Sequence, residues 1–269
     1  MISDFHMHTN WSSDSPSRPK DMVREAIRKG MDVICITDHQ DIGLPYCEGE
    51  MEARLDVGPY LKAMKRLREH YQDRIDVRLG IELGLQRHLA GVYEEMLKEK
   101  PFDFIIGSGH VFDGMDPCYD PYFDDKTDEE GYRHAFEITL ENIKRFTNFD
   151  VLGHMDYVVR YGSKQDKSYS YKQNADILDE IMKYLISNGK GIEINTAGWK
   201  YGLPFAHPHK DVIKRYRELG GEIITVGSDA HRPEHVGYDF YKVNALLKEC
   251  GFKYYTEFSE RKPIFRQLP

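Results

Sequence analysis

A regular alternation of short apolar segments with helical patterns, running along the whole chain, most constrains how it can fold. Seven segments rich in Val and Ile are expected to be β-strands, at residues 1–6, 32–37, 76–81, 102–106, 150–152, 191–194 and 222–226. Strands that are apolar through most of their length are typical of a parallel sheet buried on both faces. Seven such strands spread over the chain favour one closed α/β barrel over an open sheet.

The segments between these strands carry the spacing of amphipathic helices. Six helices are predicted, at residues 19–29, 59–71, 132–146, 175–187, 208–219 and 238–249. Residues 127–130 (TDEE) form a capping box before the third helix. We find no linker, low-complexity tract or internal repeat, and 269 residues suit a barrel of about 250 residues. The chain is therefore expected to form one domain over residues 1–269.

Composition and charge exclude several classes of protein. The formal net charge is −8 and there is no basic stripe, so nucleic acid is not an expected partner. There is no apolar run of about 20 residues and no signal peptide, so neither a membrane span nor export is expected. The four cysteines, Cys35, Cys47, Cys118 and Cys250, are scattered, which argues against a disulfide framework and predicts a cytoplasmic location. The oligomeric state stays open.

Nearly every predicted strand ends in a histidine or a carboxylate. These residues include His6, His8, Asp38, His39, Glu82, His110, His154, Asp156, Glu193, Asp229 and His231. In an α/β barrel the carboxyl ends of the strands converge on one face, where active sites lie. Imidazoles and carboxylates without cysteine suit Zn, Mn or Fe. Six histidines exceed the needs of one tetrahedral ion, so we expect two or three metal ions.

The other six histidines are scattered through the chain: His70, His88, His134, His207, His209 and His235. His70 and His134 fall in helical stretches and are expected at the surface. His207 and His209 flank Pro208 at a predicted helix start, which is typical of a cap region. Because that segment also follows a strand end, a minor role in substrate binding stays open for it.

The motifs at the strand ends resemble those of the PHP superfamily, which is named for its polymerase and histidinol phosphatase members. They are DFHMHTNWSSDS, ITDH, GIELG, SGH, GHMDYVVRYG, IEINTAG and GSDAH, in the family's order. Within that superfamily the chain is similar to the histidinol-phosphate phosphatases. The resemblance covers essentially the whole chain and implies a distorted, TIM-like (β/α)7 barrel that holds three divalent metal ions at the carboxyl ends of its strands.

The resemblance also implies which residues hold the ions. The first ion would take His6, His8, Glu82 and Asp229, the second Glu82, His110 and His154, and the third Asp14, His39 and His231. The implied reaction is hydrolysis of L-histidinol phosphate, a small-molecule phosphate monoester, to L-histidinol and phosphate in L-histidine biosynthesis. A metal-bridging hydroxide, held by Glu82, His110, His154 and Asp229, would attack phosphorus.

The remaining expected site residues would bind phosphate or move a proton. Arg160 resembles a phosphate-contacting arginine of the family, and Lys200 stands where relatives often carry arginine. Asp156 and Asp38 are candidates either for protonating the leaving alkoxide or for orienting the histidine ligands. Two other functions stay open: a PHP phosphoesterase with a different substrate, such as a 3′–5′ exonuclease, and a non-catalytic module that binds metal.

Overall fold

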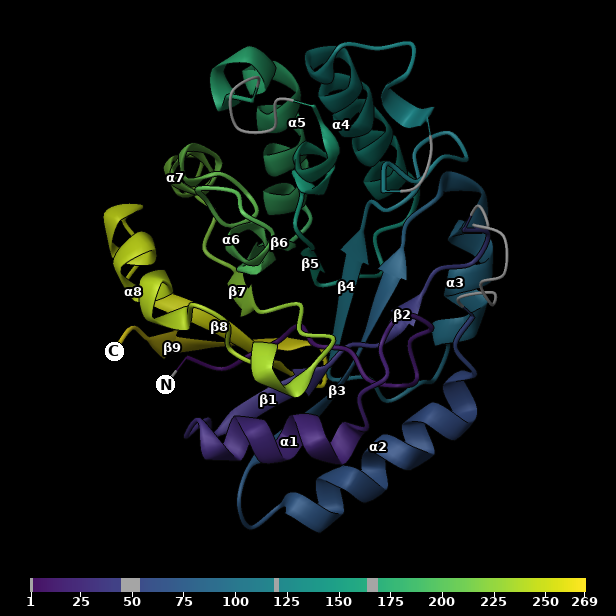
Figure 1. Ribbon diagram of the computed structural model, residues 1–269, viewed down its shortest axis with the longest axis vertical. Helices are drawn as coiled ribbons and strands as arrows, with labels where there is room; N and C mark the ends of the chain where they lie inside the picture. The colour runs from purple at the N-terminus through teal and green to yellow at the C-terminus, as the bar shows by residue number, and fades with distance from the viewer. Residues whose placement is uncertain (1, 45–53, 119–120, 164–168) are drawn as a thin grey trace.

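Seven parallel chain segments form the wall of a barrel in the computed structural model, which describes residues 2–44, 54–118, 121–163 and 169–269 (Figure 1). The sheet order is β1-β3-β4-β5-β6-β7, with the short strand β2 paired to β3. The strands are β1 (Val33–Ile36), β2 (His39–Gln40), β3 (Asp76–Gly84), β4 (Phe104–Ser108), β5 (Val151–Leu152), β6 (Gly191–Asn195) and β7 (Ile224–Gly227).

The first residues of the chain join β1 to β7. On one side, Cys35 N donates to the carbonyl of Asp4 (2.9 Å). On the other side, Phe5 N donates to the carbonyl of Val226 (2.9 Å) and His8 N to that of Ala230 (2.9 Å). Residues 4–8 therefore lie between β1 and β7 and close the wall. The α/β barrel is as the sequence predicts, and the strand ends meet on one face. The expected first strand, residues 1–6, is present in the described part of the chain only as isolated bridges at Asp4 and Met7.

Helices lie outside this wall (Figure 1). They are α1 (Pro19–Arg28), α2 (Val57–Tyr71), α3 (Ala90–Leu97), α4 (Asp128–Arg145), α5 (Ala175–Ser187), α6 (Ala197–Lys200), α7 (Lys210–Glu218) and α8 (Phe240–Glu249). Six of them match the predicted helices within two residues at nearly every end, whereas α3 and α6 were not predicted. The capping box at the start of α4 is present, with Thr127 N 2.8 Å from Glu130 Oε2 and Glu130 N 3.3 Å from Thr127 Oγ1.

A hairpin that the sequence patterns do not predict covers the amino-terminal end of the barrel. It consists of β8 (Tyr254–Ser259) and β9 (Lys262–Gln267), which pair antiparallel. In its turn, Glu260 N donates to Asp103 (3.1 Å) and Arg261 Nε donates to Asp150 (2.6 Å), and these two aspartates precede β4 and β5. The hairpin therefore lies opposite the face on which the strand ends meet, and the single domain over residues 1–269 stays a prediction.

The half of the barrel interior nearer the amino-terminal ends of the strands, the lower half, contains a cluster of apolar side chains. Phe5, Phe104 and Phe258 form a buried cluster together with Cys35, Ile106 and Val151. The Phe104 ring lies 5.0 Å from that of Phe258 and 5.4 Å from that of Phe5. Along the inner face of β4 the side chains change from Phe104 and Ile106 to Ser108, so on this strand the first polar side chain lies towards the carboxyl end.

Three of the four cysteines can be placed. Cys35 and Cys250 are buried and Cys118 is exposed, and these three form no disulfide among the described residues. Cys47 lies outside the described residues. In the part of the chain that the structure describes, every helix is too short or too polar to cross a bilayer.

The apolar cluster predicts how much stability is lost when Phe258, its contribution from the hairpin, is removed. Phe258 is 3% exposed, so Phe258→Ala should lower the free energy of unfolding by about 3–5 kcal/mol, the usual loss for a buried phenylalanine. Phe265 in the paired strand is 48% exposed, and Phe265→Ala should change it by less than about 0.5 kcal/mol. Urea unfolding of both variants measures this. Equal losses would mean that the hairpin does not close the core.

Candidate metal centre

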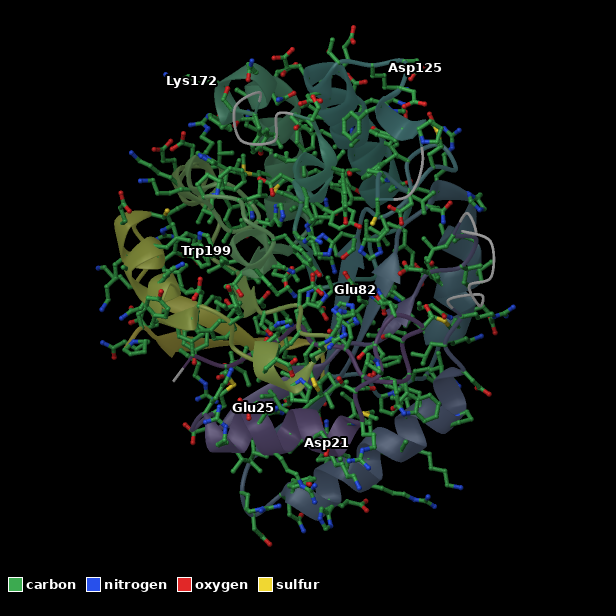
Figure 2. All side chains as sticks on the ribbon, viewed as in Figure 1. Asp21, Glu25, Glu82, Asp125, Lys172 and Trp199 are labelled. Atoms are coloured by element: carbon green, nitrogen blue, oxygen red, sulfur yellow. The ribbon has the colours of Figure 1, made fainter. Side chains whose placement is uncertain are left out.

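A single buried carboxylate, Glu82, lies at the centre of the site and near the middle of the molecule (Figure 2). It projects from β3, and Ser108 Oγ on β4 donates to its Oε1 (2.6 Å). Five histidine rings surround its two oxygens at 3.0–3.5 Å: His154 and His110 at Oε1, and His39, His6 and His8 at Oε2. Four separate strand ends are thereby brought to one carboxylate.

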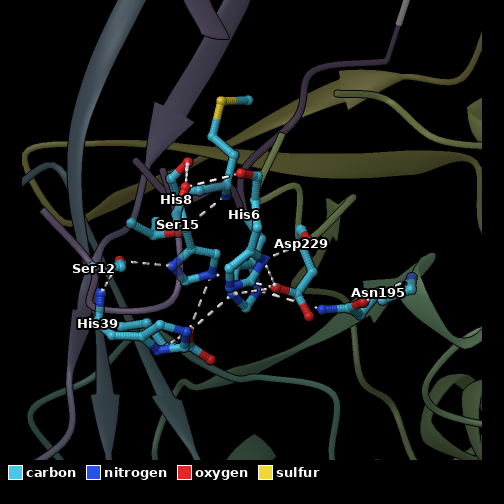
Figure 3. A network of polar contacts seen from close by, with 12 residues as sticks. His6, His8, Ser12, Ser15, His39, Asn195 and Asp229 are labelled. Carbon is cyan, nitrogen blue, oxygen red and sulfur yellow. Dashed lines mark hydrogen bonds and ion pairs between the residues drawn. The ribbon is translucent and has the colours of Figure 1, made fainter. Parts of the chain in front are cut away.

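A second carboxylate, Asp229, follows β7 and faces the same histidines. Its Oδ1 lies 3.3 Å from Nε2 of His8 and 3.9 Å from Nε2 of His6 (Figure 3). Its Oδ1 is also 3.5 Å from Nδ1 of His231. Asp229 has a left-handed backbone (φ 53°), a costly conformation for a residue other than glycine that is often found at functional sites. This conformation turns its carboxylate towards the strand ends.

The half-exposed carboxylate of Asp14 completes the outer edge of the site. Its Oδ2 lies 2.9 Å from Nε2 of His231 and 3.5 Å from Nε2 of His39. The His8 ring stacks between those of His39 and His231, with ring centroids 4.0 and 4.2 Å away. The structure thus brings together all nine side chains that the resemblance implies as metal ligands.

The donor set fits divalent metal ions. Three groups of ligand atoms within 4.8 Å of one another draw on these side chains alone: His6 with His8 and Asp229, His6 with Glu82 and His154, and His8 with His39 and His231. Among the described residues, Nε2 of His6 and of His8 and Oε2 of Glu82 are buried and have no hydrogen-bond partner. Buried nitrogen and oxygen atoms that converge without hydrogen-bond partners are an arrangement that a bound cation would satisfy.

Two carboxylates lie behind the histidines: Glu193, which the sequence placed at a strand end without a role, and Asp41, which it did not single out. Glu193 on β6 has Oε1 2.6 Å from Nδ1 of His6, and its Oε2 accepts from the backbone N–H of His154 (3.0 Å). Asp41 lies 3.0 Å from Nδ1 of His110 and 3.1 Å from Nδ1 of His39, and it forms a fourth ligand group with them. Carboxylates in such positions fix the tautomer and the orientation of histidine ligands. In the sequence, the two-residue spacing of His39 and Asp41 was the feature that could have indicated Asp41, because residues two apart on a strand face the same side.

The two aspartates proposed for proton transfer have other partners. Asp38 accepts from the backbone N–H of Thr9 (2.6 Å) and from Ser12 Oγ (2.8 Å), and Ser12 Oγ is 3.3 Å from Nδ1 of His8. This placement favours the interpretation that Asp38 orients a histidine. Asp156 contacts His207, as described below.

The two predicted phosphate-binding cations lie near Asp229. Lys200, at the end of α6, donates from Nζ to the backbone carbonyl of Asp229 (2.8 Å). Arg160 lies in a short 3₁₀ helix after β5, and its guanidinium faces the rings of Tyr201 (4.2 Å) and Tyr157 (5.0 Å). The negative charge of Asp229 acts on both cations.

The close packing of imidazoles and carboxylates shifts their pKa values. Burial would raise the pKa of Glu82, but His6, His39 and His110 hold it well below its usual range. Burial would lower the pKa of His110, but Asp41 and Glu82 raise it to about 10. The pKa values of His6 and His39 are also raised, against burial, by nearby carboxylates. In the metal-free protein the nearby carboxylates therefore favour the protonated form of these three histidines.

These pKa shifts predict that metal uptake releases protons. An imidazole must be neutral to bind metal, so ions entering the metal-free protein displace protons from His6, His39 and His110. Metal affinity should therefore increase with pH up to about 10, the pKa of His110. Calorimetric titration in two buffers of different ionisation enthalpy measures the proton count. Metal binding without proton release would contradict the proposed ligand roles.

The contacts of Glu193 predict that it supports metal binding without being a ligand. In Glu193→Gln one carboxylate oxygen becomes an amide, which cannot accept from both His6 and the backbone of His154. We expect metal affinity to fall about 10–100-fold, as for other residues behind metal ligands. Glu257, buried far from the site beside Arg266, offers the matched control, and Glu257→Gln should keep the affinity. Competition with a chelator measures both, and equal affinities would disprove the role of Glu193.

Known proteins share this architecture. The family profile of the PHP domain matches residues 4–197. Histidinol-phosphatase of Lactococcus lactis is 32% identical over 96% of this chain and 95% of its own length, and a probable histidinol-phosphatase of Thermotoga maritima is 31% identical over 93% of each. The crystal structure of the Lactococcus lactis enzyme, complexed with zinc, L-histidinol and phosphate, superposes with a TM-score of 0.87 over 98% of both chains. The sequence and the fold of this chain together show that it belongs to the PHP domain family.

Proposed function

We propose that this chain is a metal-dependent phosphomonoesterase that hydrolyses L-histidinol phosphate to L-histidinol and phosphate, a step of L-histidine biosynthesis. The observation that carries the proposal is the convergence of nine ligand side chains on one face of the barrel, with Arg160 and Lys200 beside them. Similarity over nearly the full length to a histidinol-phosphatase supports the choice of substrate. The cytoplasmic location and the absence of a nucleic-acid partner stay predictions.

The site is proposed to hold three divalent ions, of Zn, Mn or Fe. The ligands are those implied by the resemblance: His6, His8, Glu82 and Asp229 for the first ion, Glu82, His110 and His154 for the second, and Asp14, His39 and His231 for the third. The zinc in the related crystal structure supports this metal class. Asp41 lies close enough to His39 and His110 to serve as a further ligand or to orient them.

The chemistry is divided between the ions and the side chains. When bound, divalent ions lower the pKa of water for attack on phosphorus and offset the negative charge of the phosphate. Glu82 links the ligand groups, while Glu193 and Asp41 hold the histidine rings so that their other nitrogens face inward. Arg160 suits phosphate oxygens because its planar guanidinium can donate two parallel hydrogen bonds. Lys200 adds a point charge on the side of Asp229.

Assays of substrate range test this proposal against its alternatives. The metal-loaded protein is offered L-histidinol phosphate, other small phosphate monoesters and a single-stranded oligonucleotide. We expect the highest kcat/KM for L-histidinol phosphate and no release of nucleotides. A higher value for another ester or nuclease activity would favour a different PHP phosphoesterase, and no turnover at full metal loading would favour a binding module. The complete ligand set counts against the last outcome.

Arg160 separates phosphate binding from metal binding. A guanidinium cannot ligate a cation, so Arg160→Met should leave the metal content unchanged. Charge-assisted hydrogen bonds contribute roughly 1.5–3 kcal/mol, so kcat/KM should fall about 10- to 100-fold. Arg133 in α4, which pairs with Glu137 and Asp176 at the surface, provides the control, and Arg133→Met should keep full activity. Lost metal or unchanged kinetics in Arg160→Met would return this residue to a structural role.

A further inference from the structure

His207 lies beside the proposed metal centre, between the carboxyl ends of β5 and β6. Its backbone pairs with that of Asn195, the last residue of β6: Asn195 N donates to His207 O (2.6 Å), and His207 N to Asn195 O (2.8 Å). The side chain of Asn195 reaches within 3.5 Å of Nδ1 of His6 (Figure 3). The ring of His207 contacts Asp156, two residues beyond His154. His207 is thus connected to the neighbourhood of two proposed ligands, through Asn195 to that of His6 and through Asp156 to that of His154. It belongs to none of the ligand groups described above.

The contacts of Asp156 determine which nitrogen of His207 carries the proton. Asp156 Oδ1 lies 2.5 Å from Nδ1 of His207, and its Oδ2 accepts from the backbone N–H of His209 (2.7 Å). Both oxygens act as acceptors, so Nδ1 is the donor. Burial lowers the pKa of His207, and the charge of Arg160 adds to this effect against the opposing effect of Asp156. The neutral ring therefore has its lone pair on Nε2.

That lone pair lacks a donor among the described residues. The His207 side chain is fully buried, and its Nε2 has no hydrogen-bond partner there. A buried acceptor without a donor is unfavourable, and native structures rarely retain one without a functional reason. The arrangement points to a ligand that brings its own N–H group.

We propose that His207 binds substrate, accepting at Nε2 a hydrogen bond from the ammonium group of an amino-alcohol phosphate; this inference rests on the proposed function. A phosphate dianion has no proton to donate, so it cannot be the partner. In L-histidinol phosphate the ammonium-bearing carbon adjoins the ester CH₂, which makes the ammonium the donor nearest to the phosphate. The ring hydrogen-bonds to Asp156, two residues beyond the ligand His154, and the backbone of His207 pairs with Asn195, whose side chain reaches His6. The ring therefore lies beside the expected phosphate position. Asp156 behind the ring adds a negative charge that favours a cation.

The first test compares two esters that differ only in the amine. In His207→Asn the amide nitrogen takes the place of Nδ1 and still donates to Asp156, while Nε2 is removed. We expect the ratio of kcat/KM for L-histidinol phosphate to that for its amine-free analogue, 3-(imidazol-4-yl)propyl phosphate, to fall at least tenfold. His134→Asn, at a partly exposed histidine of α4 that pairs with Asp113 and not with Asp156, should keep the wild-type ratio.

The second test inverts the hydrogen bond without removing the ring. In Asp156→Asn the oxygen stays with the His209 N–H, so the amide NH₂ faces Nδ1 of His207 and forces the proton onto Nε2. Nitrogen-15 NMR of the ring should report the exchanged tautomer, and the selectivity ratio should fall as in His207→Asn.

Each other result has a definite meaning. An unchanged ratio in a folded, metal-loaded His207→Asn protein would overturn this inference alone, as would equal losses on both esters, which would place His207 on the phosphate side. An unchanged ratio in Asp156→Asn with the tautomer exchanged would also overturn it. A wild-type protein without preference for the amine-bearing ester would overturn the proposed function, and the inference with it.

Discussion

The burial of the Glu82 carboxylate among histidine rings is the interaction on which the rest of this structure depends. Moving a charge into a protein interior costs several kcal/mol unless other charges or hydrogen bonds compensate for it. Neutral imidazoles alone do not supply that compensation, and four further carboxylates, Asp14, Asp41, Glu193 and Asp229, lie around the same rings. Such an accumulation of negative charge is stable only with protons or metal ions between the groups, which links folding of the barrel mouth to metal binding.

The barrel makes this burial achievable by dividing its interior into two halves. The lower half is filled by phenylalanine rings and closed by the β8–β9 hairpin, while the upper half holds polar groups. Close packing of the strands beneath the site depends on Gly80, since a Cβ there would lie 2.6 Å from Cys35 Sγ. The closely packed lower half thus fixes the distances between the strand ends, and with them the distances between the proposed ligand side chains.

Most of the fold could be predicted because helices and strands follow local patterns, and a barrel brings strand ends together whatever their separation in sequence. The strand-end pattern also marked most of the side chains that meet at the site, whereas Asp14, in the loop after the first strand, came only from the family resemblance. The hairpin escaped prediction because β8 (YYTEFS) buries Thr256 and Glu257, whose polar partners lie far away in sequence, such as Ser3 for Glu257. The roles of Glu193 and His207 depend on contacts between separate strand ends, which spacing along one segment does not reveal.

The most direct test of the account is anomalous diffraction from crystals of the metal-loaded protein, recorded at the absorption edge of the bound metal. We predict three peaks at the carboxyl ends of the strands, with Glu82 coordinating ions on both of its oxygens and with the inward nitrogens of His6, His8, His110 and His154 as ligands. A single peak, or ions that leave Glu82 uncoordinated, would contradict the claim that this buried carboxylate organises the site.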